Sequence, residues 1–484
     1  MNRLARMAVA TLAVLCLFTV GAGVAVARMM PARLALFRVA EVSGAGVRPP
    51  GGSLPAATGS LSARRPGLAA TPAGVAARLG PLLTGGRLWT RAGALVTNLA
   101  TGRVLYALNP STGFTPASTT KLATAVAALH VLGPRATFTT SVVSSGQGHD
   151  IVLVGGGDPT LAAASYPAAD YPQPATLSGL AARTATALRA RGVRSVRLSY
   201  DEALFGGPVQ APGWPAFGSV NNYITTGNVA PITALEVDQG RLTAQGTPEN
   251  SDDPGNYRPR SMTPGRDAVR AFAVALRRDG IAVRGPIRSV RAVRNASVLA
   301  AVHSPPLAQI VQWMLVESNN VIAETLARQV AIATGRPATF AGGARAVTAV
   351  DARLGVTGIR IDDGSGLSPL DSITPRALVK LISLASAPGA SSLRPVITGM
   401  PVAGFSGTLA AGSYFGPFAP AALGTVRAKT GNLSAVATMA GVAYARNGQL
   451  LGFAFMGAFP RRRVLAAMSA LAGLASVIAG CGCR

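Results

Sequence analysis

Two stretches near opposite ends of the chain constrain its fold more than any other feature. Residues 93–109, GALVTNLATGRVLYALN, contain two apolar runs around a polar turn with Gly102, a pattern typical of a β-hairpin. Residues 434–459 repeat this pattern around Asn447-Gly448, a strong turn signal. Helical patterns lie between them, so the sequence predicts one sheet that is assembled from both ends of the chain.

Residues 137–300 have a different pattern. Strand-like residues 149–161, HDIVLVGGGDPTL, are followed at 175–200 and 265–285 by two segments that each predict a helix and then a strand. After residue 305 long helical patterns return. We therefore predict an α/β (α+β) fold, with an antiparallel sheet flanked by helices in a domain of residues 75–136 and 301–484, and an inserted α+β domain of residues 137–300.

The N-terminus has the pattern of an export segment. Arg3 and Arg6 precede an uncharged apolar run at residues 7–27 that ends in Ala25-Val26-Ala27, a small-x-small cleavage pattern. The run is also about long enough to span a bilayer, for which roughly 20 residues are needed. We expect residues 1–30 to be a signal peptide or a membrane anchor, and the Gly/Pro/Ser-rich residues 31–74 to be a flexible linker.

The formal net charge of +26 suggests affinity for polyanions, but its distribution does not favour nucleic acid. Basic residues are scattered singly, and no basic run is interleaved with aromatic residues. An anionic cell envelope would still attract such a surface. Cys16, Cys481 and Cys483 are too few for a zinc site or a disulfide framework, and whether Cys481 and Cys483 pair is left open.

Lysine is far rarer than arginine, with three copies against 42. Lys121 follows Ser118 by three residues at a predicted helix start, with Thr115 as the expected cap and Pro116 at the first helical position. Side chains at this spacing share a helix face. Arginine cannot give up its proton in a protein, whereas a buried lysine can become neutral and activate a serine. The alternative is a capped helix start with an exposed lysine.

Two further motifs could take part in catalysis or substrate binding. Lys429-Thr430-Gly431 enters the C-terminal hairpin as a strand, where glycine lets another backbone approach closely; the alternative is an ordinary edge-strand lysine. Ser318-Asn319-Asn320 lies between two helical runs and could relay a proton or hold an amide; the alternative is a helix cap. We expect the third lysine, Lys380, at a solvated helix position.

Together these motifs resemble a known family. Ser118-Thr119-Thr120-Lys121, Ser318-Asn319-Asn320 and Lys429-Thr430-Gly431 are similar, in order and context, to the Ser-x-x-Lys, Ser-x-Asn and Lys-Thr-Gly motifs of penicillin-binding proteins and serine β-lactamases. Residues 153–161 and 362–375, and the pair GTLAAG and VRAKTG, further resemble the class C type D-alanyl-D-alanine carboxypeptidase/endopeptidases, which carry a large insertion between the first two motifs. The similarity covers roughly residues 80–475.

The resemblance implies a role for each motif residue. It implies an exported hydrolase of peptidoglycan stem peptides that β-lactams inhibit covalently, without a metal or other cofactor. The implied catalytic residues are the nucleophile Ser118, its general base Lys121, the proton shuttle Ser318, the acyl-amide ligand Asn320 and the cationic Lys429. The implied substrate-binding residues are the carboxylate ligand Thr430, Gly431, and Asn432, whose backbone N–H would form an oxyanion hole with that of Ser118. The base at each separate step stays open.

Three positions depart from the family or are uncertain within it. Asn432 stands where relatives commonly have threonine, so a second hydroxyl for the carboxylate is missing. Pro369 stands where relatives often have a basic residue, which puts a contact to the stem-peptide diamino acid in doubt. Asp158 could meet an amine of the stem peptide, or could form only a turn with the proline that follows it.

Rival sites find little support in the sequence. His130, His149 and His303 have no metal-site spacing, and the Gly-rich residues 155–157 lack the Lys-Ser/Thr of a phosphate loop. Two alternatives to the peptidase remain: a serine β-lactamase or esterase on the same fold, and a non-catalytic cell-wall-binding protein. The sequence does not distinguish carboxypeptidase from endopeptidase action, nor does it give the oligomeric state.

Overall fold

A computed structural model describes residues 70–86, 88–145, 149–168, 171–242, 259–293, 295–410, 414–415 and 419–483 of the chain. The predicted signal peptide or anchor lies outside the described residues, as does the predicted linker up to residue 69. None of the described helices is both long enough and apolar enough to cross a membrane.

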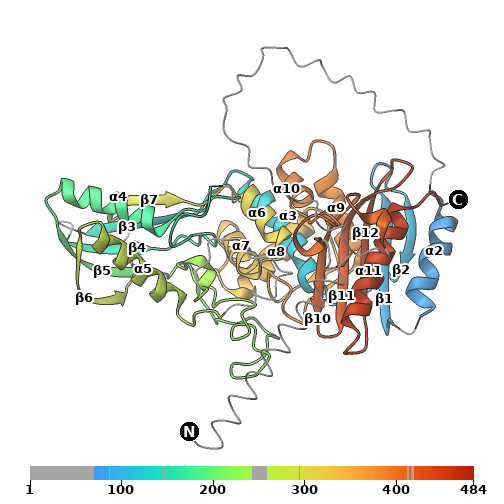
Figure 1. Cartoon of the computed structure of the whole chain (residues 1–484), viewed down its shortest axis with the longest axis horizontal. Helices are drawn as coiled ribbons and strands as arrows, with labels where there is room; N and C mark the ends of the chain where they lie inside the picture. Colours follow the sequence, from blue (N-terminus) through green and yellow to red (C-terminus); the bar gives the residue numbers. More distant parts are fainter. Residues whose placement is uncertain are drawn as a thin grey trace, which may run out of the picture. The chain divides into compact units, whose positions relative to one another are not determined.

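The first sheet joins the two chain ends, as the two hairpins predict (Figure 1). All of its pairings are antiparallel. Its strands, in spatial order, are β10 (Val426–Leu433), β11 (Val436–Tyr444), β12 (Leu450–Ala458), β1 (Arg91–Asn98) and β2 (Val104–Leu108). Arg91 pairs with Ala458 and Asn98 with Leu451, so the N-terminal hairpin lies against the C-terminal one over the whole of β1.

Helices cover both faces of this sheet because its central strands bury residues on both sides. In β1, Leu95 belongs to the core on one face, whereas its neighbours Ala94 and Val96 belong to the core on the other, following the period of two of a strand. The face with Ala94 packs against α2 (Pro72–Thr84) and α11 (Val464–Ala479). The opposite face packs against α9 (Pro375–Ser386).

A helical layer lies behind α9 and contains the segments that carry two of the three motifs (Figure 1). Its helices are α3 (Lys121–Leu132), α6 (Leu307–Val316), α7 (Asn320–Ala333), α8 (Phe340–Arg353) and α10 (Arg394–Thr398). The contacts of α3 with α7, α8 and α9 are extensive, and α3 is buried along nearly its whole length. The start of α3 is therefore held by packing on several sides.

The second sheet lies within residues 139–303. Its strands, in spatial order, are β6 (Ala282–Ser289), β5 (Ser195–Asp201), β4 (Asp150–Val154), β3 (Thr139–Ser145) and β7 (Ser297–His303). The pairs β4–β5 and β5–β6 are parallel, joined by α4 (Leu177–Ala190) and α5 (Pro264–Arg278), as the two helix-then-strand patterns predict. This mixture of helices and strands confirms the predicted fold class, while the exact domain limits stay a prediction.

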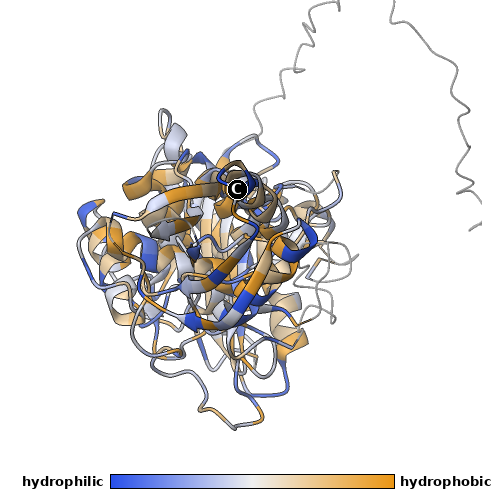
Figure 2. Cartoon of the chain, turned by 90° about the vertical axis from the view of Figure 1, so that its left-hand side faces the viewer, coloured by the Kyte–Doolittle hydropathy of each residue, from blue (hydrophilic) through white to orange (hydrophobic). Residues whose placement is uncertain are grey.

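The helices of this second region are amphipathic. In α5, Ala268, Phe272 and Leu276 are buried, whereas Arg270 and Arg277 are exposed. Figure 2, which views this side of the chain, shows hydrophilic and hydrophobic residues interspersed along the ribbons rather than gathered in separate zones. This agrees with the sequence, in which basic residues occur singly rather than in runs.

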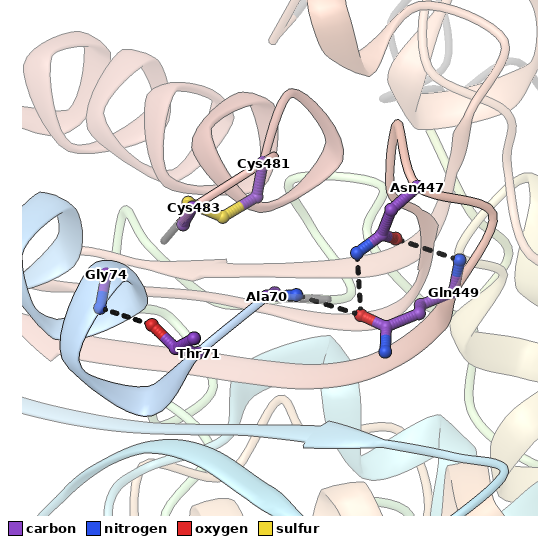
Figure 3. Close-up of a disulfide and its surroundings, with 7 residues drawn as sticks. All are labelled: Ala70, Thr71, Gly74, Asn447, Gln449, Cys481 and Cys483. Atoms are coloured by element: carbon purple, nitrogen blue, oxygen red, sulfur yellow. Dashed lines mark hydrogen bonds between the residues drawn. A yellow bond between two sulfur atoms is a disulfide. The ribbon is translucent and has the colours of Figure 1, made fainter. Parts of the chain in front are cut away.

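The first and last described residues are tied together beside the sheet (Figure 3). Cys481 and Cys483, whose pairing the sequence left open, form a disulfide. The N–H of Thr71 donates to the carbonyl of Cys483 at 3.0 Å, and the Thr71 side chain caps α2 by accepting from the N–H of Gly74. These contacts fix α2 and α11 on the same face of the sheet.

Candidate active site

A pocket of about 390 Å³ brings the three motifs together. Its lining residues come from the start of α3, the α6–α7 connection, β10, the start of α11, loops of the second region, and the segments around Leu367, Thr408 and Tyr414. They are Ser118, Gly227, Asn228, Arg260, Glu317, Ser318, Asn319, Asn320, Leu367, Thr408, Tyr414, Thr430, Gly431, Asn432, Val464 and Met468. Six of the residues that the sequence proposes thus lie on one pocket, although they are up to 314 positions apart in the chain.

Ser118 lies in a short 3₁₀ turn, Ala117–Thr120, that leads directly into α3. Ala117 has a left-handed φ of 48°, which costs energy for a residue other than glycine and is common at functional sites. The predicted Thr115 cap is wrong: the turn begins after Pro116 without a side-chain cap. Residues 116–118 pack closely against Gly431, and the Thr115 hydroxyl instead donates to the carbonyl of Pro369 at 3.3 Å.

Lys121 is fully buried, and its Nζ lies 2.9 Å from Ser118 Oγ. The same nitrogen donates to Asn320 Oδ1 at 2.7 Å and to the carbonyl of Ser365 at 2.8 Å. Burial lowers the pKa of Lys121 to about 7, although nearby carboxyls, Asp363 first among them, partly oppose this shift. The lysine is therefore poised between its charged and its neutral form near physiological pH.

Buried carboxyl groups hold the loop that supplies the Ser365 carbonyl. Glu324 accepts from the backbone N–H groups of Gly364 and Ser365, at 2.9 Å and 2.8 Å. Asp363 accepts from the indole N–H of Trp214 at 2.8 Å. Burial raises the pKa of Glu324 to about 8 and also raises that of Asp363, so these groups offer less negative charge to Lys121 than ordinary carboxylates would.

The second motif lines the pocket, and its middle residue also caps a helix. Asn319 caps α7 by accepting from the N–H of Ile322 at 3.0 Å, so a helix cap is indeed present. Ser318, with a left-handed φ of 58°, and Asn320 line the pocket together with Asn319. The Asn320 side chain also donates to the carbonyl of Asn228 at 2.9 Å and so connects Lys121 to the second region.

The third motif lies on β10, at one edge of the first sheet. Lys429 is fully buried and donates to the carbonyl of Thr430 at 2.8 Å, while Thr430 contacts the hydroxyl of Thr408 at 3.1 Å. A methyl group on Gly431 would lie 2.7 Å from the carbonyl oxygen of Pro116 and 2.9 Å from the N of Ser118. Glycine is needed here because the segment that carries the nucleophile itself approaches the strand.

Asn432 contributes a side chain as well as a backbone group. Its amide nitrogen donates to the hydroxyl of Tyr414, a buried residue that also lines the pocket. A hydroxyl group therefore does lie beside the position where the sequence lacks the family's usual second threonine. It comes from a residue 18 positions earlier in the chain, and no pattern in the sequence predicted it.

Asp158 is not among the residues that line the pocket. It is buried, and its Oδ1 accepts from the N–H and the hydroxyl of Thr160 at 2.8 Å and 2.6 Å, as in an ordinary turn. Burial raises its pKa to about 6. Lys380 is exposed on α9, as expected.

Several residues that line the pocket were not predicted from the sequence. Gly227, Asn228 and Arg260 come from loops of the second region without a recognisable motif. Thr408 was present only within a stretch that suggested the family, GTLAAG. Local spacing could not reveal them because they reach the pocket through long-range packing.

Comparison with known proteins places these features in context. Residues 75–259 and 252–476 match the family model described as "D-Ala-D-Ala carboxypeptidase 3 (S13) family". A carboxypeptidase of Mycobacterium tuberculosis is 38% identical over 86% of both chains. The carboxypeptidase DacB of Mycolicibacterium smegmatis is 35% identical over 80% of both chains.

Among solved structures, the chain resembles penicillin-binding protein 4 of Haemophilus influenzae. The TM-score is 0.64 at 22% identity, covering 82% of this chain and 97% of the other. A second structure of that protein, in complex with a β-lactam, matches with a TM-score of 0.58 at 21% identity and covers 81% of this chain and 97% of the other. At this identity the likeness establishes a shared fold.

Proposed function

The chain belongs to the D-Ala-D-Ala carboxypeptidase 3 (S13) family and is a D-Ala-D-Ala carboxypeptidase, and from this premise we propose that it works outside the cytoplasm through an acyl-Ser118 intermediate. The observation that carries the proposal is the 2.9 Å contact between Ser118 Oγ and the buried Nζ of Lys121. Its substrates are the D-Ala-D-Ala ends of peptidoglycan peptides, and β-lactams acylate the same serine.

The first half of the reaction acylates the enzyme. A neutral amine has two hydrogens, which Asn320 Oδ1 and the Ser365 carbonyl accept, and its lone pair is then directed at the Ser118 hydroxyl. Lys121 removes this proton as Oγ attacks the carbonyl carbon of the D-Ala-D-Ala bond. The peptide bond breaks, and the departing D-Ala amine receives a proton through Ser318.

The pocket wall would bind the substrate on both sides of this bond. Thr430 holds the terminal carboxylate, and Asn320, whose amide has a second hydrogen besides the one given to Asn228, holds the acyl-side amide. The N–H groups of Ser118 and Asn432 stabilise the oxyanion; each such donor is typically worth about 3–4 kcal/mol. Water then hydrolyses the acyl-enzyme, which returns the serine hydroxyl and releases the shortened peptide.

The acylation rate should depend on pH through Lys121. With a pKa of about 7, the lysine is mostly protonated below that value and cannot accept the serine proton. We expect the rate of acylation by benzylpenicillin to rise about tenfold per pH unit on the acidic side and to level off above about pH 7. Stopped-flow measurements from about pH 5 to about pH 9 check this. A rate that is independent of pH throughout would exclude a titrating lysine base.

The function itself is tested on the wild-type protein. Mass spectrometry after incubation with benzylpenicillin should show a covalent adduct that persists, and a peptide ending in D-Ala-D-Ala should release free D-Ala. Rapid loss of the adduct with turnover of penicillin would identify a β-lactamase instead. Failure of both reactions would leave only a binding role. A cross-linked dipeptide dimer as substrate distinguishes endopeptidase action.

A further inference from the structure

The loop that presents the Ser365 carbonyl to Lys121 is held by the side chain of Asp363. Asp363 is fully buried, and it is not among the residues that line the described pocket. We propose that Asp363, held in turn by Trp214 of the second region, is a positioning residue for acylation, because it fixes the carbonyl that orients the Lys121 amine. This inference rests on the proposed function, in which Lys121 is the base that activates Ser118.

Asp363 acts on the peptide group that joins Ser365 to Gly366. The Gly366 N–H donates to Asp363 Oδ1 at 2.6 Å. The carbonyl of the same peptide group accepts from Lys121 Nζ at 2.8 Å. Because a peptide group is planar and its N–H and C=O point in opposite directions, the carboxyl that holds the N–H also sets the direction of the carbonyl. The preceding peptide group is fixed as well, since the Ser365 N–H donates to Glu324 Oε1 at 2.8 Å.

Gly366 leaves this loop little freedom to move. Its φ of 85° is left-handed, and a methyl group on it would collide with the carbonyl oxygen of Ala117 and lie 2.8 Å from Thr120 Oγ1. The loop thus packs directly against the turn that carries the nucleophile. Ser365 and Asp363 are fully buried, so a hydrogen bond that is lost here leaves a polar group unpaired in the interior, which is costly.

Trp214 connects Asp363 to the second region. Its indole N–H donates to Asp363 Oδ2 at 2.8 Å, and the N–H of Ser368 donates to the same oxygen at 2.6 Å. The indole is itself packed edge-on against Phe340 and Tyr223, with ring centres 5.2 Å and 5.9 Å away. Through this contact the second region takes part in orienting the catalytic base, although Trp214 does not line the pocket.

Asp363 also influences Lys121 through its charge. Burial raises the pKa of Asp363, whereas its three N–H donors and the Lys121 ammonium lower this pKa. Among the carboxyls that raise the pKa of Lys121, Asp363 contributes most, ahead of Glu324 and Asp371. A neutral side chain at position 363 should therefore lower the pKa of Lys121 further. Asparagine would also turn its amide N–H₂ toward an N–H donor in either orientation, because both oxygens of Asp363 accept from such donors.

Acylation by benzylpenicillin, followed from about pH 5 to about pH 9, tests the inference in Asp363→Asn. The plateau rate should fall roughly 10-fold to 100-fold, because the amine lone pair is no longer directed at the serine. The midpoint of the acidic limb should move to lower pH than in wild type, because Lys121 loses a carboxyl that favours its charged form. Trp214→Phe keeps an aromatic ring without the N–H donor, and its plateau should fall about threefold to tenfold, with a midpoint shift in the same direction.

Asp351→Asn is the matched control for the aspartate. Asp351 is an equally buried residue of α8, and its carboxyl oxygens have no hydrogen-bond partner within the part of the chain that the structure describes. Trp89→Phe is the control for the tryptophan, because the Trp89 indole N–H likewise has no partner among the described residues. Both controls should keep the wild-type plateau rate and midpoint.

Three results would overturn the inference. The first is a wild-type rate and midpoint in Asp363→Asn or in Trp214→Phe. The second is an equal loss at every pH with an unchanged midpoint, which a merely structural role would give. The third is a comparable loss in Asp351→Asn. Thermal unfolding checks that each variant is folded, and Trp214→Phe decides the question if Asp363→Asn is not. Penicillin labelling of wild type reports separately on the proposed function, so the two failures are distinguishable.

Discussion

Ser118→Ala should abolish the covalent adduct with benzylpenicillin. The adduct is an ester of Ser118 Oγ, and alanine has no atom that could form it. We expect no mass increase after prolonged incubation, and release of D-Ala from stem peptides should fall to the uncatalysed background. The small change in volume at a pocket-lining position should leave the fold intact, which thermal unfolding of both proteins can verify.

Ser111→Ala is a suitable control, because Ser111 is an exposed serine outside the pocket whose hydroxyl accepts a hydrogen bond from Arg376 Nε at 3.2 Å. Labelling of this variant should match that of wild type. An intact adduct in Ser118→Ala would show that another residue is acylated, and the assignment of the nucleophile would then be rejected.

Lys121→Arg should reduce acylation nearly as severely. Arginine keeps the positive charge but cannot accept the serine proton at any accessible pH. General base catalysis contributes roughly 10²–10⁴-fold, so the acylation rate with penicillin should fall by about this factor. The site is also fully buried, and the larger guanidinium would strain it, which typically costs about 1–3 kcal/mol of stability.

Lys121→Met distinguishes the effect of losing the general base from the effect of overpacking by the larger guanidinium. Methionine has a similar length and fits an irregular buried space, yet it offers no basic nitrogen. Both variants should lose acylation, whereas only the arginine variant should lose much stability. Lys380→Arg, at an exposed position of α9, should change neither quantity. Wild-type acylation by Lys121→Met would assign the base to another group.

The elements with a strong local signal were predictable. Both hairpins, the helix that follows Ser118 and the helix-then-strand repeats depend on periodicity and turn residues within about 25 positions, and all of them are present in the structure. The sheet that both chain ends build was also predictable, because two hairpins that each lack a partner must bury their apolar faces. The start of α3 was not predicted correctly, since the packing of residues 116–118 against Gly431 overrides the local capping preference of Thr115.

The site was only partly predictable. The three motifs could be found because the reaction demands particular residue types at short spacing. The partners that set their properties come from elsewhere in the chain: the Ser365 carbonyl on Lys121, the Asn228 carbonyl on Asn320, and the Tyr414 hydroxyl on Asn432. Nothing in the local sequence distinguishes Asn228 or Tyr414 from ordinary loop positions, and residues 362–375, which contain Ser365, suggested the family without giving Ser365 a role.

The sequence by itself determined which side chains are available for the chemistry and the secondary structure on which each of them lies, because both depend on residue type and short-range spacing. Only the tertiary structure decided that Lys121 is fully buried with a pKa near 7, that Gly431 must be glycine, and that Arg260 lines the pocket while Asp158 does not. Burial and close approach are consequences of contacts between residues far apart in the chain, and such contacts exist only once the chain has folded.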